Sequence, residues 1–326
     1  MTGTAIGRRA LGGAALGLAL SSRGRAQGSW PDRPVRIVVA FSPGGEPDIL
    51  VRGMQPIMQE ALGQPVVIDN RPGGSTQIGA EHVAQARPDG YTLLLTSSTT
   101  FAVNPHLRPD VPYRLAQFRP ITQVMRARLA LFCNPRLPVR SLAELIEYAK
   151  RQPHGITYTT TLRGGVAHLA GERMKQMTSL QMTDVPFRAS TAAAQAIIRD
   201  DVDVGFDGLA TYLGLLRSGE IRALAVTGER RTEALPDVPT FAEAGFPDLA
   251  QGYWYGLFAP VGTPDALVAR ILGATRTALR NDALRAMWAA QGATLEGIDP
   301  TEFERLLASE SERWGALIRS IGLRLE

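Results

Sequence analysis

Two glycine-rich loops that carry little charge are the parts of this sequence best suited to hold a ligand. The first reads Phe41-Ser-Pro-Gly-Gly-Glu-Pro-Asp48 and lies between an apolar run and an amphipathic segment. Gly44 and Gly45 let the backbone turn freely and approach a ligand closely. The N–H groups that start the following helix favour an anion, so a carboxylate fits there without Lys or Arg. The alternative is a tight turn in which Asp48 only caps the helix.

The second loop reads Asn70-Arg-Pro-Gly-Gly-Ser-Thr-Gln-Ile-Gly79. Its glycine spacing does not match a dinucleotide fingerprint, and no Gly-Lys-Ser/Thr follows as in a phosphate-binding loop. A run of hydroxyls, Thr96-Ser-Ser-Thr-Thr100, ends a further apolar run. These segments offer neutral hydrogen-bonding groups and point to binding rather than to nucleotide chemistry.

Catalysis is not expected, and neither a metal nor a cofactor is implied. The histidines are His82, His106, His154 and His168. No two of them have metal-ligand spacing, and neither His-Glu-x-x-His nor Gly-x-Ser-x-Gly occurs. His168 is better placed to contact a ligand or the backbone. Asp207 follows an apolar run and is either a base or, as we prefer, an acceptor for loop N–H groups or water.

The elements that must position these loops alternate between two kinds. Short apolar runs read as strands at 36–40, 66–68, 92–96, 156–160, 202–206, 224–226 and 255–259. Helical patterns lie between them at 49–62, 79–86, 142–151, 167–177 and 191–199. This alternation predicts parallel sheets with helices on both faces. In such sheets ligands bind beyond the carboxyl ends of the strands.

Two stretches, 121–135 and 222–255, read as crossings between domains. The first is a long extended run, and the second is interrupted by prolines. A chain that leaves one domain, builds another and returns forms two lobes with a cleft between them. The 326 residues suffice for two domains of ordinary size.

Charge and the N-terminus bear on location and partners. Arg8, Arg9, Arg23 and Arg25 precede Gln27, and without them 31 basic residues balance 31 acidic ones. A neutral body argues against nucleic-acid binding.

The N-terminus predicts a secretion signal over 1–26 that is cleaved near Ala26. It has the positive pair Arg8-Arg9, then the apolar run 10–20, and then small residues up to Ala26. Export by the general or the twin-arginine route stays open.

Cys133 is the single cysteine and lies in an apolar run. It therefore reads as a small buried hydrophobe, with no disulfide possible inside one chain. After the predicted signal, no stretch is apolar enough over ~20 residues to span a membrane.

The sequence resembles a known family, the periplasmic binding proteins of tripartite tricarboxylate transporters, which is also called the Bug family. The resemblance covers nearly all of the mature chain, in order. Besides the Phe-x-x-Gly-Gly-x-x-Asp loop, it rests on Trp30-Pro-Asp-Arg-Pro-Val-Arg-Ile-Val-Val39, Gly63-Gln-Pro-Val-Val67, Asn70-Arg-Pro-Gly73, Pro88-Asp-Gly-Tyr-Thr-Leu-Leu94, Asn104-Pro105, His168-Leu-Ala-Gly-Glu172, Ala234-Leu-Pro-Asp-Val-Pro-Thr240 and Gly256-Leu-Phe-Ala-Pro260.

The resemblance implies the type II periplasmic-binding-protein fold, with two α/β lobes and mixed sheets around a hinged central cleft. Lobe 1 would comprise 27–124 and 226–326, and lobe 2 would comprise 125–225. The ligand would be a small carboxylate: a dicarboxylate, tricarboxylate, acidic amino acid or aromatic acid. Its contacts would come from Phe41, Ser42, Gly44, Gly45, Asp48, Gln77, Ser97, Ser98 and Thr99, and across the cleft from Gly165, Val166, His168, Ser190, Thr191 and Asp207.

Some positions depart from the family pattern. The loop before the histidine usually carries hydroxyls, but here it reads Arg163-Gly-Gly-Val-Ala-His168. Arg163 is either a two-pronged partner for a ligand carboxylate or a solvated loop residue. Phe187-Arg188-Ala189-Ser190 replaces a usual Tyr-Lys-Gly-Ser, and Pro47 replaces a common threonine. A less polar ligand, such as an aromatic monoacid, is therefore compatible with the site.

The resemblance also implies partners and location. The expected protein is a periplasmic monomer that delivers its ligand to the membrane subunits of a tripartite tricarboxylate transporter. The alternative is a receptor that presents its closed, liganded form to a two-component signalling system. Both need the lobes to close on the ligand.

Overall fold

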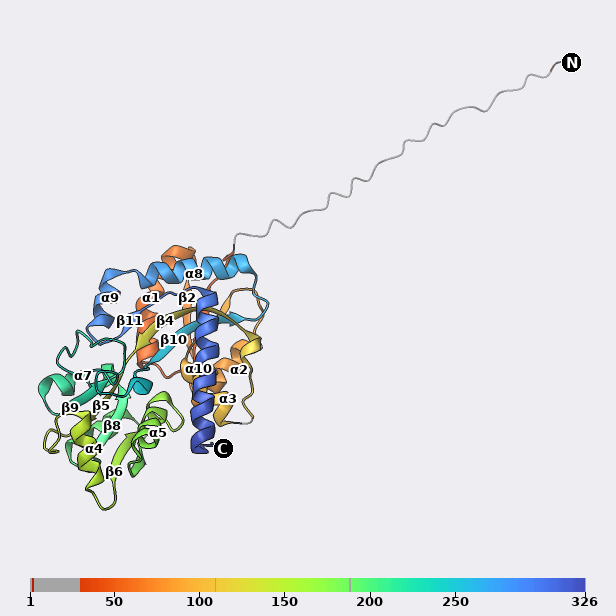
Figure 1. Ribbon diagram of the computed structural model, residues 1–326. Helices are drawn as coiled ribbons and strands as arrows, with labels where there is room; N and C mark the ends of the chain where they lie inside the picture. Colours follow the sequence, from red (N-terminus) through yellow and green to blue (C-terminus); the bar gives the residue numbers. More distant parts are fainter. Residues whose placement is uncertain (1, 3–29, 109, 188, 326) are drawn as a thin grey trace.

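The computed structural model describes residues 2, 30–108, 110–187 and 189–325, which form two α/β lobes. Figure 1 shows the first lobe around the N-terminal strands and the second in the middle part of the chain, joined side by side. The predicted signal over 1–26, apart from Thr2, lies outside the described residues, and so does Arg188.

The first lobe is built on a six-stranded sheet in the order β11-β4-β10-β3-β1-β2. Its strands are β1 (Val35–Val39), β2 (Val66–Asn70), β3 (Thr92–Ser97), β4 (Phe118–Ala127), β10 (Tyr253–Pro260) and β11 (Thr294–Leu295). β1 pairs in parallel with β2 and β3, whereas β10 runs antiparallel to β3 and β4. The carboxyl ends of β1 and β3 therefore lie at the same edge as the start of β10.

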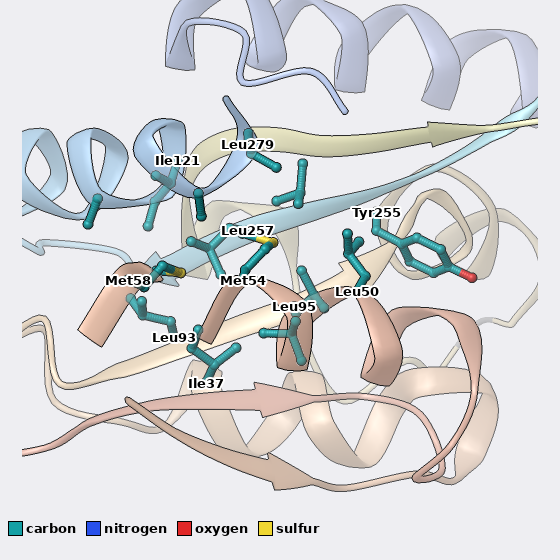
Figure 2. Close-up of a cluster of buried hydrophobic side chains, with 14 of the residues drawn as sticks. Ile37, Leu50, Met54, Met58, Leu93, Leu95, Ile121, Tyr255, Leu257 and Leu279 are labelled. Atoms are coloured by element: carbon teal, nitrogen blue, oxygen red, sulfur yellow. The ribbon is translucent and has the colours of Figure 1, made fainter. Parts of the chain in front are cut away.

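The helices of this lobe bury their apolar faces on the sheet. They are α1 (Glu46–Leu62), α2 (Gln77–Ala84), α3 (Asn104–Leu107), α8 (Asp265–Leu279), α9 (Asp282–Ala289) and α10 (Pro300–Ile321). Figure 2 shows Leu50, Met54 and Met58 of α1 packed towards the side chains of β1 and β3. Tyr255 lies at one end of this cluster with its hydroxyl directed away from it.

The second lobe has a five-stranded sheet in the order β7-β6-β8-β5-β9. Its elements are β5 (Leu129–Cys133), β6 (Ile156–Thr160), β7 (Met182–Pro186), β8 (Val204–Gly208), β9 (Arg222–Val226), α4 (Leu142–Lys150), α5 (Val166–Thr178), α6 (Ser190–Ile198) and α7 (Leu209–Ser218). β6 is parallel to β7 and β8, and β5 is antiparallel to β8 and β9. Both sheets are thus mixed, which confirms the predicted fold class.

The two connections between the lobes lie side by side. β4 passes into β5 through Arg128, whose guanidinium donates to the Thr227 carbonyl at 2.5 Å. The backbone N–H of Leu129 donates to the Thr227 hydroxyl at 2.9 Å. The segment 227–252 contributes Phe241 and Leu249 to the second lobe's core before β10 returns. β9 ends at Val226, and the chain re-enters the first sheet only at β10, which begins at Tyr253.

Helix α10 is shared between the lobes. It begins against the first sheet, where Phe303 and Leu307 join a cluster with Trp254. Its last turns place Trp314 and Leu317 in the second lobe's core. A helix that packs on both lobes ties their relative position to its own.

Two further predictions can be compared with the described residues. Cys133 is fully buried, and burial raises the pKa of its thiol to about 11, as expected for a small core residue. Within residues 30–325 as described, no helix has the length and apolarity needed to cross the bilayer.

Candidate ligand-binding site between the lobes

The first predicted loop connects β1 to α1 and has the geometry of an open helix start. Gly44 has φ +79°, a conformation that side chains rarely adopt. Gly45 is the N-cap of α1 with φ −76° and ψ 166°, and within the described chain no side chain caps this end. The first N–H groups of α1 are therefore left to meet an acceptor from outside the helix.

Asp48 organises this loop. Its carboxylate accepts hydrogen bonds from the backbone N–H of Gly44 at 2.9 Å, from Asn70 Nδ2 at 2.9 Å and from Arg52 Nε at 2.9 Å. Burial alone would raise the pKa of Asp48, but these bonds together lower it. The carboxylate stays ionised and its oxygens are committed to the loop, so Asp48 shapes the first loop rather than offering a free acceptor.

The loop between β6 and α5 repeats this geometry in the second lobe. Gly164 has φ +77°, and Gly165 is the N-cap of α5 with φ −73° and ψ 166°, again without a side-chain cap in the described structure. The backbone N–H of Gly164 donates to Nδ1 of His168 at 3.1 Å. Val166 is the first residue of α5 and is buried. Both lobes thus present a Gly-Gly turn at the start of an uncapped helix.

His168 supports the second loop. Its side chain is buried, and its ring lies nearly parallel to that of Tyr158, 6.4 Å away. Burial lowers the pKa of His168, which favours the neutral ring. A neutral ring whose Nδ1 accepts from Gly164 carries its proton on Nε2. His168 therefore contacts the backbone, one of the two roles predicted for it.

Asp207 lies at the end of β8 and accepts hydrogen bonds from several donors of the second lobe. It accepts from the Gly208 N–H at 2.8 Å, Ser190 Oγ at 2.9 Å, Tyr212 Oη at 3.0 Å and Thr161 Oγ1 at 3.3 Å. Burial raises the pKa of Asp207 although these bonds oppose the shift. The structure brings the predicted pair Ser190 and Asp207 together and gives Asp207 the acceptor role.

Glu46 was missed by the sequence reasoning, although it is the other carboxylate of the first loop. It is the first residue of α1, and its Oε2 accepts from Tyr253 Oη at 2.6 Å and Tyr255 Oη at 3.0 Å. Its Oε1 is buried without a partner among the described residues. Burial raises the pKa of Glu46, and the charge of Asp207 raises it further.

The tyrosines that meet Glu46 were also missed, because the predicted strand began only at Tyr255. Tyr253 and Tyr255 are two residues apart on β10 and so point to the same face of the sheet. A Cβ atom built on Gly208 would lie 2.7 Å from Tyr253 Oη. Tyr253 therefore bridges the Glu46 region of one lobe and the Asp207 region of the other.

The predicted hydroxyl run lies beside this group. Ser97 is opposite Tyr255 in the β3–β10 ladder, and Ser97, Ser98 and Thr99 are all buried. The Ser98 hydroxyl has no hydrogen-bond partner in the described structure. In the second lobe, the hydroxyl of Thr160 at the end of β6 is likewise buried and unpartnered there. These orphan hydroxyls lie at the carboxyl ends of strands, where a ligand is expected.

The other predicted site residues make fewer contacts with the groups described above. Arg163 forms an ion pair with Asp184 at 3.2 Å, and its side chain is 58% exposed. Thr191 and Ser42 are exposed, whereas Phe41 is half-buried with its ring 5.6 Å from that of Tyr255. Gln77 begins α2 and is half-buried.

Two hollows of the surface lie away from these loops. One of about 590 Å³ borders Arg36 and His82 in the first lobe. Another of about 430 Å³ lies beside Trp314, between α5 and α10. Neither is lined by the predicted site residues. The candidate site is therefore defined by the two uncapped helix starts and by the buried polar groups described above.

Comparison with known proteins gives one consistent result. Residues 50–323 match the model of the tripartite tricarboxylate transporter family receptor. Protein BugT of Bordetella pertussis is 34% identical over 300 residues, which is 91% of this chain and 92% of that protein.

Solved structures agree with this match. A Rhodopseudomonas palustris protein with adipate is 34% identical with a TM-score of 0.81, covering 90% of this chain and 99% of that one. MatC from the same organism, with bound malate, is 30% identical with a TM-score of 0.77, covering 88% and 99%. These relatives are solute-binding receptors and not enzymes, in keeping with the prediction from the histidines and motifs.

Proposed function

The chain belongs to the tripartite tricarboxylate transporter receptor family, and on that premise we propose that it captures a small organic carboxylate between its lobes. The observation that carries the proposal is the repeated loop geometry. Gly45 and Gly165 each start a helix of 13 residues or more with nearly the same φ and ψ, and in the described structure no side chain occupies either helix start. An anion held between two such starts gains from N–H donors on both lobes.

Relatives in the family support the ligand class. One structural relative holds adipate and another holds malate, and both ligands are dicarboxylates. This chain offers donors that suit a carboxylate, namely backbone N–H groups at the helix starts and buried hydroxyls such as that of Ser98. Members of the family are periplasmic binding proteins, which supports a periplasmic location for this chain. We further propose that it is a monomer and that its signal over 1–26 is removed.

The family match supports the membrane subunits of a tripartite tricarboxylate transporter as the partner that receives the ligand. Presentation of the closed form to a two-component sensor remains the second candidate. Pull-down of the mature, ligand-loaded protein with detergent-solubilised transporter subunits, or with a sensor ectodomain, separates the two.

The binding function is tested by thermal melting of the mature protein against a panel of mono- and dicarboxylates, with a neutral sugar and a divalent cation as controls. We expect at least one carboxylate to raise the melting temperature, because a ligand that binds only the folded state stabilises it. A response to the sugar or the cation alone would contradict the proposal.

A further inference from the structure

The first loop carries a carboxylate whose position is at odds with a purely anionic ligand. Glu46 starts α1, at the same helix end that is open to an anion. One of its oxygens receives two tyrosine hydroxyls, and the other is buried without a partner in the described part of the chain. A buried carboxylate oxygen with no donor is costly, so such an atom points to a donor that comes from outside the chain.

Among the described residues, no positively charged side chain pairs with Glu46. The ion pairs among the described residues involve neither Glu46 nor Asp207. The charged group that acts on Glu46 is Asp207, which is itself negative. Asp207 differs in that the chain supplies it with four donors. Glu46 is therefore the carboxylate of this region with an oxygen that the described chain leaves unpaired. Burial favours a proton on this carboxyl group in the unliganded protein, and a cationic donor would instead hold it ionised, with Oε1 as the acceptor.

Aromatic rings complete the surroundings. Tyr253 and Tyr255 meet edge to face with centroids 5.7 Å apart, and Phe41 meets Tyr255 in the same manner at 5.6 Å. Both tyrosines direct their hydroxyls to Glu46. A carboxylate set among aromatic rings suits a protonated amine, which can donate to the oxygen and is attracted to the rings.

From these contacts we infer that the site selects an organic acid that also carries a protonated amine, with Glu46 Oε1 accepting from the ammonium group. This inference rests on the proposed carboxylate-binding function. The ligand's acid group lies at the Gly-Gly helix starts, and its amine lies at Glu46. Glu46 then acts as a specificity-determining residue, because an acid without the amine leaves Oε1 buried and unpaired.

The test compares acids that differ only by the amine: aspartate against succinate and glutamate against glutarate, by isothermal titration calorimetry on the mature protein. We expect the amino acid of at least one pair to bind about tenfold more tightly or better, the usual effect of a hydrogen bond between charged groups. Glu46→Gln keeps the shape and the tyrosine contacts, and it should remove that preference. Glu60→Gln, an exposed residue on the same helix, is the matched control.

The outcomes separate the two proposals. If the deaminated acids bind as well as or better than the amino acids, carboxylate binding stands and the role of Glu46 is wrong. If Glu46→Gln keeps the preference for the amine, the role of Glu46 is also wrong. If a simple amine without an acid group binds and no carboxylate does, the proposed function itself is wrong, and this inference falls with it.

Discussion

Asp48 and His168 hold the glycine turns of the two lobes in the same way. Each accepts a hydrogen bond from the backbone N–H of the glycine four residues earlier, Gly44 for Asp48 and Gly164 for His168. The acceptor is an ionised carboxylate in one lobe and a neutral imidazole in the other. Different side chains thus produce the same turn, and the repeated element is the backbone geometry.

Loss of the Asp48 carboxylate should destabilise the first lobe. Asp48→Ala leaves the N–H of Gly44 and the amide of Asn70 without their acceptor, and it leaves Arg52 without its ion pair. Because the Arg52 side chain is half exposed, the cost comes mainly from the Gly44 and Asn70 donors that lose their acceptor, and it is about 2 kcal/mol. Urea denaturation measures the change, and Glu60→Ala on the exposed face of α1 is the control. A loss of under about 0.5 kcal/mol would show that the loop does not depend on Asp48.

A side chain at Gly45 should weaken ligand binding and spare the fold. The φ of −76° at Gly45 suits any residue, and a Cβ there meets only the Ser42 carbonyl at 3.4 Å and Pro47 Cδ at 3.8 Å. The methyl groups of Gly45→Val would instead occupy the space that an anion needs at the helix start. We expect affinity for the carboxylate found by melting to fall about tenfold or more, by calorimetry.

The control for that variant is its own circular dichroism spectrum and melting temperature without ligand, which should match those of the unaltered protein. Unchanged affinity in a folded Gly45→Val variant would remove the first loop from the site.

Arg163 should contribute little to affinity. Its guanidinium is exposed and pairs with Asp184 on the edge strand β7. An exposed pair of this kind is worth up to about 1 kcal/mol to stability and less in high salt. Arg163→Ala should therefore leave the dissociation constant within about twofold. A tenfold loss that Arg163→Lys does not restore would instead place the guanidinium on a ligand carboxylate.

Glu46 should make the stability of the unliganded protein depend on pH. Burial raises its folded pKa above the ordinary value of 4.5, so the folded protein holds a proton that the unfolded chain releases. The stability from this proton is complete below about pH 4.5 and is lost as the pH rises through the folded pKa. Glutamine cannot lose a proton, so Glu46→Gln should gain stability relative to the parent protein between pH 4.5 and 7.

Urea denaturation at several pH values measures that difference. Tyr253, Tyr255 and Asp207 are the groups that face position 46, and both proteins contain them. A stability difference that does not change with pH would mean that Glu46 titrates normally.

Much of the fold followed from sequence patterns, and the exceptions have physical reasons. The runs of β1, β2, β3 and β6 were predicted to within two residues. β1, β3 and β6 lie inside their sheets and are mostly buried, and such strands are rich in apolar and β-branched residues. β2 is an edge strand, but it begins with the apolar run Val66-Val-Ile68. β7 was not predicted. Its sequence Met-Thr-Asp-Val-Pro is an edge strand with mostly half-exposed residues and has no apolar run to mark it.

The residues of the candidate site were likewise predicted only in part from the sequence. Gly44, Gly45 and Gly165 stand out in the sequence because positive φ and open helix starts call for glycine. Glu46 and Tyr253 do not stand out, since their meeting depends on β10 returning from the second lobe after more than 100 residues, beside the start of α1. The alternation of Tyr253 and Tyr255 was the available signal, but without the partner strand it did not indicate which face they occupy.

The burial of Cys133 makes this protein convenient for following motion between its halves. The chain has one thiol, it is fully covered, and its raised pKa keeps it protonated at neutral pH. Cysteines introduced at exposed positions away from the candidate site, Glu60 on the first lobe and Ala143 on the second for example, would react with fluorophores while the buried native thiol does not. Energy transfer between such labels reports the opening and closing of the molecule with no need to remove the natural cysteine.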